Sequence, residues 1–88
     1  MKTVTFYTRE NCCLCDVALE VVERVRARVP FELVIVDLDH EATIEKKTAY
    51  DWDIPVLEID GRKSMKHRVD ETRLVRLLET EASSSPTE

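Results

Sequence analysis

The sequence of 88 residues contains one glycine and three prolines. A single glycine, Gly61, leaves no glycine-rich phosphate loop, so the best-known motif for nucleotide binding is absent. No apolar run approaches the roughly 18 residues of a membrane-spanning helix, and we expect no membrane association. Met1 and Lys2 lead directly into a strand-like segment without a signal-peptide pattern. We therefore expect a cytoplasmic location, where thiols are mostly reduced at rest.

Positive charge is also scarce, with 13 Lys and Arg residues against 18 Asp and Glu residues and a net charge of −5. No basic stripe with interleaved aromatic residues is present, which argues against nucleic-acid binding. The apolar share of 43% and charged share of 35% are typical of a folded chain. At this length we expect one domain over residues 1–81 that acts as a monomer. Residues 82–88, which lack an apolar anchor, should form a disordered tail.

Cysteine, in contrast, is concentrated in one place, since Cys12, Cys13 and Cys15 fall within four positions. They lie where a predicted strand ends and a predicted helix begins. A thiol at a helix N-terminus lies among unpaired backbone N–H groups at the positive end of the helix dipole, which stabilises the attacking thiolate. Residues three apart share a helix face, whereas Cys13 is turned about 100° away from Cys12. We therefore expect a Cys12–Cys15 disulfide in the oxidised protein, with Cys13 free.

Other interpretations of the cysteine cluster remain open. A structural zinc site needs four ligands, but outside the cluster the chain offers His40 and His67 and no second C-x-x-C motif. Inert core cysteines would be expected on a periodic apolar face rather than at a strand-to-helix junction. A redox pair is the leading hypothesis, with no resident cofactor or metal. The alternative is a binding module, or a carrier of metal or an iron–sulfur cluster, that does not turn over.

The first half of the chain shows a strand, a helix and a second strand. Residues 3–7 are rich in β-branched and aromatic residues and predict a buried strand. A helix should run from Leu14 to its stop at Pro30. Residues 31–36 are almost continuously apolar, which predicts a strand buried on both faces with a parallel neighbour. The helix has an apolar stripe at helical spacing formed by Leu14, Ala18, Val21, Val22, Val25 and Val29.

The second half predicts a short helix, a hairpin and a closing helix. Asp39 is the expected N-cap of a helix over residues 40–50. A strand should begin at Ile54-Pro55 and turn at Asp60-Gly61 into a basic arm, residues 62–68, which suits a protected edge strand. Asp70 is the expected N-cap of a last helix that ends near residue 81.

Two motifs in this order of elements, Cys12-Cys13-Leu14-Cys15-Asp16 and Ile54-Pro55-Val56-Leu57, resemble those of the glutaredoxin-like family of the thioredoxin superfamily. The resemblance covers residues 2–81. It implies an α/β thioredoxin fold in its minimal form, with a four-stranded mixed sheet of order 2-1-3-4 flanked by three helices. It also implies a cis peptide bond at Pro55, opposite the thiols, and Cys12 as the nucleophile.

The activity that this resemblance implies is thiol–disulfide exchange on a protein or small-molecule disulfide. Cys12 would attack the substrate, and Cys15 would resolve the mixed disulfide. Backbone groups at Ile54 and Pro55 would align the substrate. Arg9 matches a basic residue that glutaredoxins place before the first cysteine to attract a carboxylate of glutathione. Asp70 would contribute a ligand site at a helix N-terminus.

The chain departs from glutathione-binding glutaredoxins at two motifs. Those proteins carry Cys-Pro-Tyr-Cys at the active site, and a Gly-Gly pair followed by an acidic residue after the hairpin. Here Lys66-His67-Arg68 precedes Val69-Asp70, so the close backbone approach that glycines permit is not expected. We therefore expect glutathione to be a weak partner and a thioredoxin-like protein to be the reductant. Cys13 replaces a histidine common in the family, and the motif gives it no role.

Overall fold

The computed structural model describes residues 2–79. The elements, in chain order, are β1 (Thr3–Thr8), α1 (Cys13–Arg28), β2 (Glu32–Asp37), α2 (Ile44–Tyr50), β3 (Val56–Ile59), β4 (Arg62–Lys66) and α3 (Glu71–Glu79). The tail expected at residues 82–88 and the helix end expected near residue 81 lie outside the described residues.

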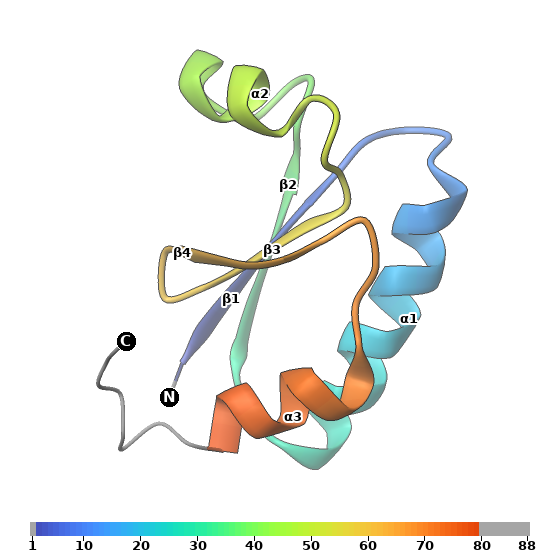
Figure 1. The fold of residues 1–88 in the computed structure, drawn as a ribbon, viewed down its shortest axis with the longest axis vertical. Helices are drawn as coiled ribbons and strands as arrows, with labels where there is room; N and C mark the ends of the chain where they lie inside the picture. The colour runs from blue at the N-terminus through green and yellow to red at the C-terminus, as the bar shows by residue number, and fades with distance from the viewer. Residues whose placement is uncertain (1, 80–88) are drawn as a thin grey trace.

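The four strands form one mixed sheet in the order β2-β1-β3-β4, which confirms the expected topology (Figure 1). β1 is parallel to β2 and antiparallel to β3, and β3 and β4 form an antiparallel hairpin. Asp60 and Gly61, at the tip of this hairpin, have φ of 51° and 86°. A two-residue type I′ turn requires positive φ at both central residues, so the Asp-Gly pair closes the hairpin as expected.

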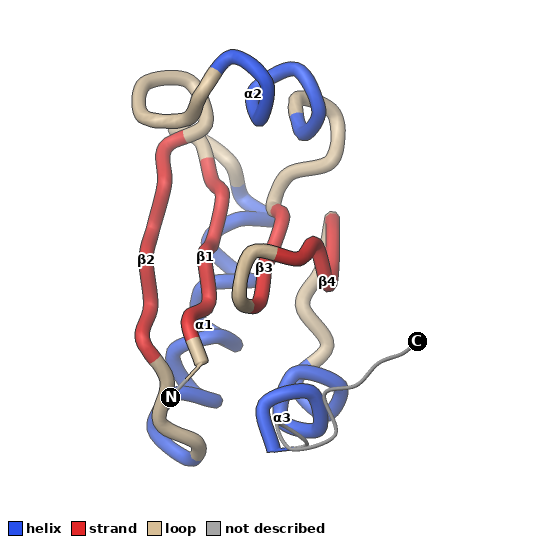
Figure 2. Tube along the Cα trace, turned by 90° about the vertical axis from the view of Figure 1, so that its left-hand side faces the viewer, coloured by secondary structure: helices blue, strands red, loops and turns tan. Residues whose placement is uncertain are grey.

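The main core lies between the sheet and two helices. Figure 2 shows α1 behind the strands, α3 below the hairpin, and α2 at the upper end of the sheet. The carboxyl ends of β1 and β2 point toward α2, so the loop that follows β1 leaves the sheet at this upper end (Figure 1). The fully buried residues of the core come from β1, α1, β3 and α3 and include Val4, Phe6, Val22, Val25, Leu57 and Leu74.

The buried face of α1 differs from the expected stripe at its start. It passes through Cys15, Ala18, Val22 and Val25. Leu14, expected in the stripe, is 53% exposed. Adjacent residues of a helix point about 100° apart, so burial of Cys15 turns the preceding side chain out of the core. The helix ends at Arg28 with Val29 as C-cap, in agreement with the stop expected at Pro30.

The expectation that β2 is buried on both faces is wrong. Its parallel pairing with β1 is confirmed, but β2 is an edge strand of the sheet. Val34 and Ile35 remain 41% and 46% exposed. The continuous apolar run indicated a strand correctly, whereas its burial depends on which faces the helices cover, and an edge strand is covered less than a central one.

The N-cap expected for the short helix is also wrong. Thr43, not Asp39, caps α2, with its hydroxyl oxygen 3.2 Å from the backbone nitrogen of Lys46. Asp37 instead turns the chain after β2 by accepting the backbone N–H groups of Asp39 and His40 at 2.9 and 3.1 Å. Such local bonds from an Asp side chain favour a turn over a helix. A second apolar cluster, of Tyr7, Leu38, Tyr50 and Val56, attaches α2 to the sheet.

Candidate active site

The structure contains a disulfide between Cys12 and Cys15 at the N-terminus of α1, with the two Cα atoms 5.2 Å apart. Cys12 is the N-cap of the helix, and its Sγ accepts the backbone N–H of Cys15 at 3.1 Å. Cys13 is exposed and is not part of the disulfide. Both the pairing and the position relative to the helix agree with the expectation from sequence.

The two bonded cysteines differ in exposure. Cys15 is 2% exposed and belongs to the core, whereas Cys12 is partly buried at the edge of that core. An incoming sulfur in line with the disulfide would therefore reach Cys12 more easily than Cys15. Because exchange requires access as well as a thiolate, this geometry favours Cys12 for contact with an external partner and Cys15 for an internal step.

The Ile54-Pro55 segment lies at the same edge of the sheet as the disulfide. Tyr7 of β1 pairs with Val56 of β3, so Pro55 stands beside the point where the cysteine-bearing loop leaves β1. The Ile54–Pro55 peptide bond is cis, and Pro55 is fully buried. Ile54 packs against the same core cluster as the cysteines. The structure thus brings Cys12, Cys15, Ile54 and Pro55 together.

His67 holds this segment from the other side. Its backbone N–H donates to the carbonyl oxygens of Pro55 and Asp53 at 2.8 and 3.1 Å, and its ring Nε2 lies 3.3 Å from the carbonyl oxygen of Trp52. The φ of His67 is 68°, in the left-handed region that glycine tolerates best. The chain adopts this backbone bend with a histidine instead of a glycine, and the left-handed conformation costs about 1–2 kcal/mol. The replacement of a glycine pair is visible in the sequence, but this role of His67 is not.

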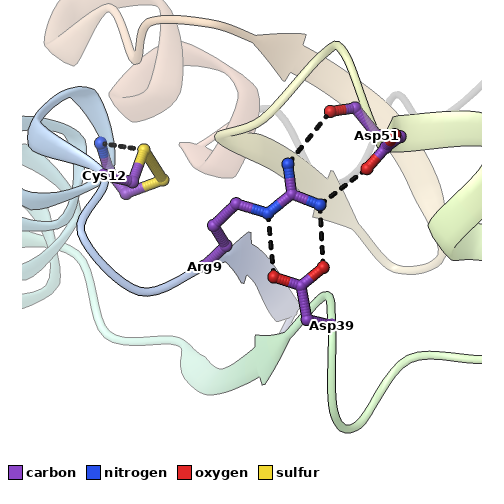
Figure 3. Close-up of a disulfide and its surroundings, with 5 residues drawn as sticks. Arg9, Cys12, Asp39 and Asp51 are labelled. Atoms are coloured by element: carbon purple, nitrogen blue, oxygen red, sulfur yellow. Dashed lines mark hydrogen bonds and ion pairs between the residues drawn. A yellow bond between two sulfur atoms is a disulfide. The ribbon is translucent and has the colours of Figure 1, made fainter.

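Arg9 lies between two carboxylates and points away from the disulfide (Figure 3). Its Nε and Nη2 bind the two carboxylate oxygens of Asp39 at 3.0 and 2.8 Å, and Nη2 also binds Asp51 at 2.6 Å. A third nitrogen, Nη1, donates to the backbone oxygen of Asp51 at 3.3 Å. Arg9 therefore fastens the loop before Cys12 to the β2–α2 loop and to the end of α2.

These bonds also set the charge around Arg9. The hydrogen bonds from Arg9, and then from Lys47, hold the pKa of Asp39 well below its usual value. The bonds to Asp39 and then to Asp51 raise the pKa of the Arg9 guanidinium. Asp39 is thus ionised at neutral pH and offsets the charge of Arg9. Attraction of a glutathione carboxylate by Arg9 stays a prediction, and such a ligand would compete with both aspartates.

Asp70 caps α3 as expected, because its Oδ1 accepts the backbone N–H of Arg73 at 3.0 Å. Its carboxylate is therefore already engaged at the helix N-terminus. Among the hydrogen bonds and ion pairs of residues 2–79, none links Arg9 or Asp70 to the cysteines. The predicted ligand-binding roles of both residues remain predictions.

A buried carboxylate that the sequence did not reveal fixes α2 to β3 just beyond Pro55. The Glu58 side chain is 5% exposed, and its Oε2 accepts bonds from Lys46 Nζ and Tyr50 Oη, both at 2.6 Å. The hydroxyl of Tyr7 is 3.5 Å from Oε1. Burial, and then the bond to Glu58, raises the pKa of Tyr50. One sign of this network was a single acidic residue within an otherwise apolar strand.

Within residues 2–79, no three His, Cys, Asp or Glu side chains are arranged so that they could hold a metal ion. No helix in this part of the chain is long and apolar enough to cross a membrane.

Comparisons with known proteins agree with this fold. The family described as Glutaredoxin-like domain (DUF836) matches residues 3–79. A glutaredoxin-like protein of Dictyostelium discoideum is 35% identical over 81 residues, covering 88% of this chain and 75% of that protein. A structural-genomics target protein from X. campestris has a TM-score of 0.69 at 28% identity, over 94% of this chain and 99% of that chain. A mutant thioredoxin from Halobacterium salinarum has a TM-score of 0.70 at 20% identity, over 97% and 78% of the two chains.

Proposed function

Since this chain belongs to the glutaredoxin-like domain family, we propose that it is a thiol–disulfide oxidoreductase whose redox pair is Cys12 and Cys15. One observation carries the proposal. The two sulfurs are bonded at the N-terminus of α1, with Cys15 buried and Cys12 nearer the surface. This arrangement suits a redox pair in which one thiol attacks the substrate disulfide and the other releases the reduced substrate.

The cycle begins with both cysteines reduced. The Cys12 thiolate attacks one sulfur of a substrate disulfide, so the substrate S–S bond breaks, a bond to Cys12 forms, and the departing thiolate takes a proton from water. Cys15, as thiolate, then attacks the sulfur of Cys12 and releases the second substrate thiol. The substrate gains two electrons, and the protein ends as the Cys12–Cys15 disulfide.

Several described contacts support this chemistry. The Cys12 Sγ accepts the Cys15 N–H, and a charge-assisted bond of this kind stabilises a thiolate more than a thiol. Backbone groups of Ile54 and Pro55, held by the N–H of His67, would align an extended substrate beside the thiols. Arg9 keeps the preceding loop in place through Asp39 and Asp51.

We further propose that the chain acts as a monomer on protein or small-molecule disulfides, with a thioredoxin-like protein as reductant. Glutathione should serve poorly, because the glycine pair is replaced and Arg9 already binds two carboxylates. An iron–sulfur or metal carrier remains the alternative from the sequence.

The experiment compares insulin reduction by the wild type and by three single variants, with dithiothreitol as electron donor. Cys12→Ser should abolish the protein-dependent rate and Cys15→Ser should remove most of it, whereas Cys13→Ser, the matched control, should change it little. An active Cys12→Ser would overturn the proposal. Stoichiometric iron in protein purified without oxygen, combined with no insulin reduction by the wild type, would favour the carrier instead.

A further inference from the structure

A basic groove lies between β4 and the start of α3. It has a volume of about 610 Å³, and its lining includes four cations and one carboxylate: Lys63, Lys66, Arg68, Arg73 and Asp70. This excess of positive charge stands out on a chain with a net charge of −5. The single carboxylate is already engaged in capping α3.

The cations of the groove are weakly neutralised. Lys63 and Lys66 share one carboxylate, Asp53, each at 3.9 Å. No ion pair within residues 2–79 involves the side chain of Arg68 or Arg73. Because exposed guanidinium groups form bidentate bonds to carboxylates readily, these two side chains are suited to an acidic ligand.

An apolar groove adjoins the basic one and leads back to the cysteines. Its volume is about 290 Å³, and it lies between the first turns of α1 and the segment from His67 to Val69. Leu14 and Val17, which line it, are 53% and 61% exposed. Leu14 is the residue before Cys15, so this groove begins beside the redox pair. Arg68 and Val69 line both grooves, so the two grooves adjoin each other at these residues.

We propose that the two grooves together bind an acidic, extended segment of a disulfide-containing protein. An apolar side chain of that segment packs on Leu14 and Val17, and acidic side chains further along bind Arg68 and Arg73. This inference rests on the proposed oxidoreductase function and names its substrate class, an acidic polypeptide rather than a small disulfide.

The chemistry of the surface distinguishes an acidic polypeptide from a nucleic acid. A nucleic acid carries negative charge along its whole length, and the net charge of −5 would repel it outside the groove. Among the described residues, no Phe, Tyr or Trp side chain lines either groove, so bases would lack the large aromatic faces on which they stack in single-strand-binding proteins. A polypeptide can instead place its charges only over the basic half and an apolar residue over the other half.

The test measures binding to the oxidised protein by fluorescence anisotropy, so that it does not depend on turnover. The probes are a labelled cysteine-free peptide with a leucine followed by a run of Asp and Glu, and the same peptide with Lys at the acidic positions. The acidic peptide should bind about tenfold more tightly at low ionic strength, and added salt should reduce the difference. Amide shifts of the protein should map to residues 14–21 and 63–73.

Substitutions in the two grooves test which side chains bind the acidic peptide. Arg68→Glu combined with Arg73→Glu should weaken acidic-peptide binding about tenfold, as expected for two exposed charge pairs replaced by repulsion. Arg62→Glu is the control for a charge reversal outside the grooves, because Arg62 is exposed on β4 but does not line either groove. Leu14→Ser should also weaken binding. All of these side chains are exposed, so the fold should tolerate the changes.

Three outcomes would overturn the inference. They are equal binding of the two peptides, an effect of Arg62→Glu as large as that of the double variant, and tighter binding of a single-stranded oligonucleotide than of the acidic peptide. Failure of the oxidoreductase function itself would appear separately, as the absence of insulin reduction by a protein that still binds the peptide.

Discussion

The buried network around Glu58 allows a prediction of stability from two matched variants. Tyr50→Phe removes a hydroxyl that donates to Glu58 at 2.6 Å, while the ring keeps its edge contact with Tyr7, whose centroid lies 5.2 Å away. A hydrogen bond to a charged group contributes about 1.5–3 kcal/mol. Because Lys46 still binds the carboxylate, we expect Tyr50→Phe to lower the free energy of unfolding by about 2 kcal/mol.

Tyr7→Phe is the control, since it removes a hydroxyl from the same carboxylate at 3.5 Å. A bond of this length is weak, and the expected loss is below about 1 kcal/mol. The two variants delete the same atom from the same residue type in one cluster. The difference between them therefore isolates the short hydrogen bond from the general effect of losing a hydroxyl.

The network also predicts a loss of stability in alkali. Burial, followed by the bond to Glu58, raises the pKa of Tyr50 above its usual value of 10.0. The folded state then holds this proton more tightly than the unfolded chain does. The stability that results is fully present below the pKa of Tyr50 in the unfolded chain, and it is lost as the pH rises through the pKa of Tyr50 in the folded state. Tyr50→Phe should therefore show a shallower loss of stability above about pH 10 than the wild type.

Urea titrations followed by circular dichroism, at about pH 7 and at several values up to about pH 11, provide the measurement. The reasoning would be refuted if Tyr50→Phe were as stable as the wild type at neutral pH, or if Tyr7→Phe cost more than Tyr50→Phe. Equal alkaline slopes for wild type and Tyr50→Phe would refute the pH argument alone.

In the reduced protein, Cys12 should react with iodoacetamide at neutral pH faster than Cys13, which lacks the N-cap position; equal rates by peptide mass spectrometry would contradict this. Arg9→Gln should lower the free energy of unfolding at neutral pH and make it fall less steeply in acid, as measured by urea titrations. The reason is that the bond from Arg9 lowers the pKa of Asp39 in the folded state below its usual value of 3.8. The stability that this bond contributes is present above pH 3.8 and is lost as the pH falls through the pKa of Asp39 in the folded state. An unchanged acid slope would speak against it. Glutathione should reduce the Cys12–Cys15 disulfide of the oxidised protein more slowly than a thioredoxin with its reductase, because Asp39 and Asp51 occupy Arg9; a faster glutathione rate, followed as thiols appearing on the protein, would show the opposite.

Most of the fold followed from local signals in the sequence. The Asp60-Gly61 turn, the Asp70 cap and the stop before Pro30 each depend on a few neighbouring residues, and each is present in the structure. The sheet order came from the resemblance, because strand patterns alone do not say which strands are neighbours. The same limit explains the error for β2, whose apolar sequence does not reveal that it lies at an edge.

The candidate site was predictable to the extent that it is local. The Cys12–Cys15 pairing follows from helix geometry. The partners of Arg9 do not, because Asp39 and Asp51 are 30 and 42 positions away in sequence. The sequence shows that His67 belongs to the segment that replaces a glycine pair, but the bonds of His67 to the segment before β3 depend on tertiary packing. Contacts between distant segments are what the sequence alone could not supply.

The most direct test of the proposed mechanism is to identify the sulfur that bonds to substrate. Cys15→Ser retains the attacking thiol but lacks the resolving one, so reaction of the reduced variant with a peptide disulfide should stop at the mixed disulfide. Non-reducing peptide mapping by mass spectrometry should then find the substrate on Cys12. Substrate bound mainly at Cys13, or no mixed disulfide at all, would contradict the assignment of Cys12 as the nucleophile.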